Sequence, residues 1–189
     1  YDDKEIDMYL LFNDLNMELK GEMYGNSTEL LATGKCEKFV LNYDSTKYIS
    51  NVTLETKTLF NVNYDKMDII IKENELMVNR LPLEVLGKIQ MPNDSMFFDL
   101  SFKTKESGFE NFLALIPEDY EKYTKSVKTS GNATVAGKIN GLYYNEIYPE
   151  FNMDIQISDG NLKYADMPEE IKNIKGNIRL FKPEGELDL

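Results

Sequence analysis

The sequence predicts a mainly β protein, built as one long curled antiparallel sheet that forms a groove or half-barrel, with one short broken helix near residues 108–123. Two observations support this prediction. Apolar and polar residues alternate with a period of two over much of the chain, which is typical of antiparallel strands with one apolar and one hydrated face. Glycines also recur inside the alternating segments, where they usually mark a bulge, a bend or a close backbone approach. Together these features favour a curled sheet.

The alternation defines the strands that we expect. In the segment 52–64, Leu54 and Phe60 share one face, while Glu55 and Lys57 occupy the other. The same pattern occurs in residues 6–12, 15–23, 81–91, 133–139 and 151–157. The glycines within strand patterns are Gly21, Gly87, Gly137 and Gly176.

Turn-forming residues separate some of these strands. Residues 158–161 read Ser-Asp-Gly-Asn and predict a hairpin turn, because Asp-Gly accepts the positive φ of a primed turn. Residues 73–75 predict a second hairpin turn between residues 68–71 and 76–78. The Pro-Asn-Asp-Ser run at 92–95 is expected to separate two further strands.

One segment has a helical period instead. Between residues 108 and 123, Phe109, Phe112 and Leu113 fall on one helical face, and Pro117 opens a second short turn. We expect this broken helix to pack on the end of the sheet or to plug it. Residues 167–170 are compatible with a further helical turn or with a loop.

Composition excludes several classes of function. The chain has no histidine and one cysteine, which excludes His-based triads, Cys-His dyads and His-based metal sites. Its net charge of −12 argues against nucleic-acid binding, which needs a basic face. Neighbouring carboxylates such as Glu118/Asp119 and Glu169/Glu170 are more typical of helix-dipole partners than of catalysts. We therefore predict no enzyme activity, no catalytic residue, no metal site and no cofactor.

The single cysteine has two interpretations. Cys36 is either a small packed strand residue or a reactive thiol.

The length and the first residue of the chain bear on its domain organisation. The 189 residues predict a single β-rich domain, 1–189. No apolar run approaches the roughly 20 residues of a membrane-spanning helix. The chain begins at Tyr1 without an initiator methionine, and we expect it to be a fragment of a longer protein.

The apolar strand faces are the remaining candidate for function. They either form a closed core or line an open groove for an apolar ligand, and periodicity alone does not separate these two. Two features lean towards the groove, namely the scarcity of helix to cover long strands and the nine methionines, whereas composition and pattern as a whole favour a plain core. The residues expected on this face, and proposed to contact lipid, are Leu54, Phe60, Leu83, Val85, Val135, Ile155 and Ile157.

Several segments of the chain form a recognisable set of motifs: residues 116–120 (Ile-Pro-Glu-Asp-Tyr), 129–141, 148–151 (Tyr-Pro-Glu-Phe) and 157–164, together with 78–83 and 98–102. In these segments the chain resembles the AsmA-like family of bacterial cell-envelope proteins. The resemblance covers nearly the whole chain and is best from about residue 76 onward. Its motifs are hydrophobic-and-glycine patterns that include no catalytic signature.

The resemblance implies a periplasmic segment of a membrane-anchored protein from a Gram-negative bacterium. The family is similar to repeating β-groove lipid-transfer proteins, so it implies phospholipid or another acyl lipid as the ligand, and a role in lipid transport or outer-membrane maintenance. Anchoring would belong to parts of the parent outside this sequence. The alternative function is a closed-core β scaffold that contacts other envelope proteins. A hydrolase would require carboxylates that converge in a pocket, and the sequence offers no persuasive pair.

Overall fold

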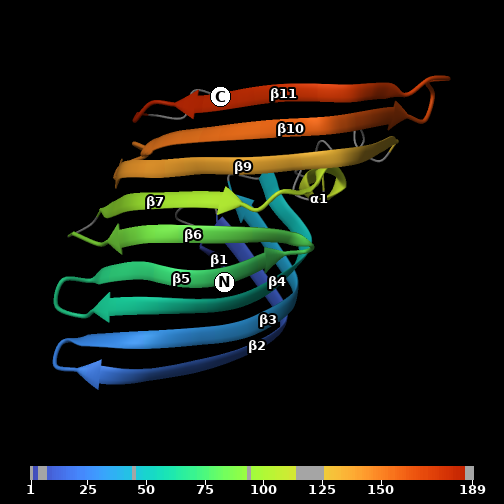
Figure 1. Ribbon diagram of the computed structural model, residues 1–189. Helices are drawn as coiled ribbons and strands as arrows, with labels where there is room; N and C mark the ends of the chain where they lie inside the picture. Colours follow the sequence, from blue (N-terminus) through green and yellow to red (C-terminus); the bar gives the residue numbers. More distant parts are fainter. Residues whose placement is uncertain (1, 4–7, 44–45, 93–94, 114–125, 186–189) are drawn as a thin grey trace.

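The computed structural model describes residues 2–3, 8–43, 46–92, 95–113 and 126–185 (Figure 1). The elements are β1 (Asp2–Asp3), β2 (Met8–Tyr24), β3 (Ser27–Tyr43), β4 (Thr46–Asn63), β5 (Asp68–Val78), β6 (Leu81–Gln90), β7 (Met96–Thr104), β8 (Ser107–Gly108), α1 (Phe109–Leu113), β9 (Val127–Tyr143), β10 (Glu150–Tyr164) and β11 (Ile171–Lys182).

All the strands belong to one antiparallel sheet in the order β1-β2-β3-β4-β5-β6-β7-β9-β10-β11, with β8 paired to β9 beside this path. The sheet is curled, and in Figure 1 parts of β2, β3 and β4 pass behind β5 and β6. It does not close, because β11 at one end of the order does not pair with β1 or β2 at the other. The predicted fold class, a mainly β protein with one long curled antiparallel sheet, is confirmed.

Irregularities in the strands accompany the curl. Asp14 has a φ of 51°, and the β3–β4 register shifts between Cys36 and Phe39. An extra residue of this kind bends a strand and increases its twist. The predicted segments 6–12 and 15–23 are thus joined in the single strand β2, with Asp14 as the irregular residue between them.

The two hairpin turns predicted from Asp, Asn and Gly are wrong. Strand β10 continues through residues 158–161, where Asp159 has a φ of 51° and the register shifts between Ile157 and Gly160. Strand β5 likewise continues through residues 73–75. Residues that accept positive φ serve bulges as well as turns, so their presence did not identify the connection. The separation of strands at 92–95 is confirmed, since β6 ends before it and β7 begins after it.

The described part of the predicted helix is α1, which packs against β9. Residues 114–123, including the turn expected at Pro117, lie outside the described residues. Residues 167–170 form a loop between β10 and β11.

Two of the strand glycines sit at close backbone approaches. Gly87 has a φ of 132°, and a Cβ added there would collide with the carbonyl oxygen of Asp99. A Cβ on Gly137 would collide with the ring of Phe102 and the carbonyl oxygen of Asn152. A side chain at either position would force neighbouring strands apart, as the sequence pattern indicated.

The buried core is small. The buried apolar residues among those described are Ala32, Cys36, Val52, Val78, Leu81 and Ala133. The accessible surface is 12608 Å², against roughly 9,300 Å² for a compact protein of this mass. The curled sheet therefore leaves far more surface in contact with solvent than a closed domain would.

Candidate functional site

The seven residues predicted for the apolar face lie on the same side of the sheet. Residues that pair directly across antiparallel strands point to one face. Leu54 pairs with Val78, which pairs with Leu81 at the start of β6. Leu83 and Val85 follow Leu81 at alternate positions of β6.

The same pairing carries this side of the sheet to the last strands. Val85 pairs with Phe102, and Phe102 pairs with Gly137, two positions from Val135. Val135 pairs with Ile155 of β10. The alternation within β4 adds Phe60, and that within β10 adds Ile157. The sheet thus brings all seven onto one continuous surface, which we call the apolar face.

None of these seven side chains is fully buried, and each is half-buried. Four apolar residues of the same face are almost completely buried: Val52 and Ala133 are 1% exposed, and Cys36 and Leu81 are 2% exposed. Val52 and Cys36 lie beside the register irregularity between β3 and β4. Since α1 is the one helix among the described residues and packs against β9, no second layer covers the rest of this face there. The apolar face is therefore an incompletely covered strip.

The strip is wider than the predicted site. It includes Phe102 of β7, whose ring stacks on that of Phe151 with centroids 6.1 Å apart. It becomes more exposed toward the first and last long strands, reaching 73% at Met23 of β2 and 47% at Ile178 of β11. The alternation that identified the seven residues also marked residues 15–23, so this edge could have been included from sequence.

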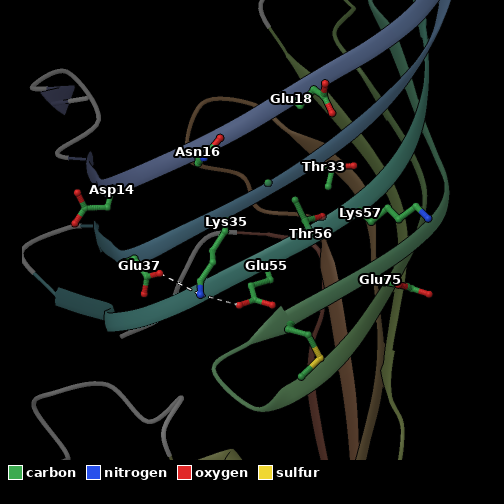
Figure 2. Close-up of a pocket in the computed structure, with 12 residues that line it drawn as sticks. Asp14, Asn16, Glu18, Thr33, Lys35, Glu37, Glu55, Thr56, Lys57 and Glu75 are labelled. Carbon is green, nitrogen blue, oxygen red and sulfur yellow. Dashed lines mark ion pairs between the residues drawn. The ribbon is translucent and has the colours of Figure 1, made fainter.

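The opposite side of the sheet, which we call the polar face, carries charged side chains. A shallow hollow of about 730 Å³ lies on β2–β5 and is lined by Asn16, Glu18, Lys35, Glu55 and others. Figure 2 shows these side chains around the hollow. Lys35 Nζ lies 3.1 Å from a carboxylate oxygen of Glu37 and 3.2 Å from one of Glu55. Hydrogen bonds to Glu37 and Glu55 raise the pKa of Lys35 above its ordinary value. These exposed charges keep this part of the face hydrated.

A second polar-face hollow, of about 290 Å³, spans β6, β7, β9 and β10. At its margin, Arg179 Nε of β11 donates a hydrogen bond of 2.7 Å to Asp154 Oδ1, which raises the pKa of Arg179. Such exposed pairs contribute little to stability. The polar face carries most of the charged side chains of the sheet, although apolar residues such as Ile70 and Leu142 are also exposed on it.

Metal-ligand geometry and Cys36 are two further points raised by the composition. No cluster of three or more Cys, Asp or Glu side chains there is placed to hold a metal ion. Cys36 is buried in β3, which agrees with a packed strand residue. Within the described ranges, no helix has the length and hydropathy needed to cross a bilayer.

Comparison with protein-family models, with curated proteins and with solved structures finds no match to this chain.

Proposed function

We propose that this chain is a non-enzymatic segment of an AsmA-like envelope protein that binds lipid acyl chains along its apolar face. In this role it contributes to phospholipid transport or to outer-membrane maintenance. The observation that carries the proposal is the incomplete covering of the apolar face: Leu83, Val85 and Ile155 lie half-buried in the middle of a sheet that no other described layer covers.

The physical chemistry supports a lipid more than a small polar ligand. An acyl chain that covers this strip gains about 25 cal/mol for each Å² of apolar surface removed from water. The strip runs across strands β2 to β11 and is mainly apolar, with threonines such as Thr58 and Thr104 among its apolar residues, so it suits a long flexible hydrocarbon. The charged polar face keeps the other side of the sheet in water. This division is what a carrier needs to shield a lipid tail while remaining soluble.

The closed-core scaffold is less well supported. A closed core would bury most apolar side chains of the strand faces, and those of β2 and β11 are instead exposed, including Leu19 at 59% and Leu180 at 46%. Exposed apolar surface that continues over several strands is a mark of interaction sites. The scaffold predicts no bound lipid, which separates the two functions by experiment.

The cellular setting comes from the resemblance in residues 116–164 and 78–102. We place the chain in the periplasm of a Gram-negative bacterium, as part of a membrane-anchored parent. Its ligand would be phospholipid or a related acyl lipid, and other envelope proteins are possible partners of the parent.

The first prediction concerns lipid retention. Val85→Asp and Ile155→Asp each place a carboxylate in the apolar strip, where an acyl chain cannot solvate it. We expect native mass spectrometry of the purified chain to show bound phospholipid. In each variant, the fraction of chains that carry phospholipid should be at least tenfold lower than in the unmodified chain. Organic extraction after incubation with phosphatidylethanolamine and phosphatidylglycerol vesicles measures the same quantity.

Gln156→Asp is the matched control, because Gln156 neighbours Ile155 on β10 but is exposed on the polar face. It should retain lipid as the unmodified chain does. Circular dichroism checks that each variant keeps its strand content. A lipid-free mass for the unmodified chain, unchanged by the vesicles, would refute the proposal, as would full retention in a folded variant with both substitutions.

A further inference from the structure

The two outer long strands of the sheet present unpaired edges. Strand β1 covers only the first residues of β2, through Asp2 with Tyr9 and Asp3 with Met8. Among the described strands, none pairs with the outer side of β2 from Leu11 to Tyr24, or with the outer side of β11. An edge of this length, beside exposed apolar residues, is a ready template for pairing with another strand.

The charges on these two edge strands are opposite. Strand β2 carries Asp14, Glu18 and Glu22 with the single base Lys20. Strand β11 carries only basic charged residues: Lys172, Lys175, Arg179 and Lys182. Glu18, Lys175 and Arg179 are highly exposed, with side-chain exposures of 63%, 76% and 73%. The β11 edge therefore complements the β2 edge and repels a copy of itself.

This asymmetry selects one mode of pairing between two copies of the chain. A two-fold dimer would join β2 to β2 or β11 to β11, and so would bring like charges together. Joining β11 of one copy to β2 of the next brings opposite charges together. With the apolar faces on the same side, the alternating directions of the strands make this junction a parallel pair.

The spacing of the charges fits such a junction. Glu18 and Glu22 lie four residues apart on the polar face of β2, and Lys175 and Arg179 lie four apart on the same face of β11. Four residues along a strand span about 13 Å, so both acids can meet both bases in one register. Glu18, Lys175 and Arg179 would there share or exchange the exposed ion pairs that they form within one copy with Lys20, Asp159 and Asp154.

The same register also matches the apolar face. It places Gly176 beside Leu19 and Ile178 beside Gly21, so that at both positions a large side chain lies next to a glycine. Met23 then neighbours Leu180, which continues the apolar strip across the junction. Charge, shape and hydropathy all agree on this arrangement.

We propose that the chain assembles with copies of itself head to tail, with the basic edge of β11 pairing in parallel with the acidic edge of β2, so that the apolar face extends from copy to copy. The interface is heterologous, so it propagates into longer assemblies instead of stopping at a dimer. Its strength depends on salt, because the charged side chains lie in solvent.

Sedimentation velocity of the full 189-residue chain tests this arrangement. We expect a concentration-dependent series of species at 50 mM NaCl, with association weakened about tenfold at 500 mM. Lys175→Glu/Arg179→Glu places acids at the contact positions of both edges, and Glu18→Lys/Glu22→Lys places bases at the contact positions of both edges. Each variant alone should be monomeric, and an equal mixture of the two should associate again.

The mixture is the decisive measurement, because general loss of folding cannot restore association. Lys175→Glu alone serves as a milder variant, because it reverses a single charge and breaks only one exposed pair, in which the Lys175 ammonium lies 3.8 Å from Asp159. A monomeric unmodified chain at every concentration and salt would overturn the proposal. So would an association that both reversals leave unchanged, or a stable dimer that does not grow.

Discussion

Cys36 illustrates how single residues support the curl of the sheet. Its Sγ lies 3.3 Å from the carbonyl oxygen of Asn13 and 3.2 Å from that of Lys38, next to the register shift in β3. The side chain is 2% exposed. A thiol is small enough for this site and can donate a weak hydrogen bond to either carbonyl oxygen. Its role is therefore structural.

We predict that Cys36 resists thiol reagents in the folded chain. Because reagent can reach the sulfur only when β2, β3 and β4 separate locally, labelling should be at least a hundredfold slower than in 8 M urea. Labelling with a chromogenic disulfide reagent, followed by mass spectrometry, measures the rate. Complete reaction within the mixing time under native conditions would contradict the placement of this residue.

At the scale of elements, strand β5 shows how a side chain can replace backbone hydrogen bonds between two strands. The β5–β6 register shifts between Ile71 and Leu76. There Asn74 takes the place of backbone pairing: its Oδ1 accepts a hydrogen bond of 2.9 Å from the Val85 backbone N–H, and its Nδ2 donates to the Val85 carbonyl oxygen. Both backbone polar groups of Val85 that face β5 therefore have hydrogen-bond partners.

Asn74→Ala should therefore destabilise the chain by about 1–3 kcal/mol, because it leaves two part-buried backbone groups of Val85 without partners. Urea unfolding followed by circular dichroism gives the free energy of unfolding. Glu73→Ala is the control, since Glu73 is the exposed neighbour of Asn74 on the same strand. Equal stabilities for the two variants would show that Asn74 does not hold the strands together.

The sequence predicted the strand faces well because alternation is a local property. It placed Leu54, Val85 and Ile155 on one surface without knowledge of the pairing. It failed at Asp159, because positive φ suits a turn and an irregular strand residue alike. It failed at Asn74, because an asparagine side chain that is common in turns here bonds to the backbone of the next strand. It also left open how far the apolar face is covered, since coverage depends on how the whole sheet bends.

At the scale of the molecule, the large accessible surface and the small core have a measurable consequence. We predict that the native chain, stripped of lipid, binds the uncharged apolar dye Nile red without denaturant, because the apolar face is already exposed. Fluorescence should fall when vesicle lipid competes for the face and when urea unfolds the chain. A closed core would instead give a signal only near the unfolding midpoint.

The order of the strands also governs how the sheet can form and come apart. Apart from the step from β7 to β9, each long strand pairs with the strand that precedes it in the chain. Hairpins can therefore add one after another, each closing a short loop, so little entropy is spent on distant contacts. Opening follows the reverse path from β2 and β11 inward, as in a linear array of repeats. The outer strands are therefore expected to unpair first, and the middle strands of the sheet last.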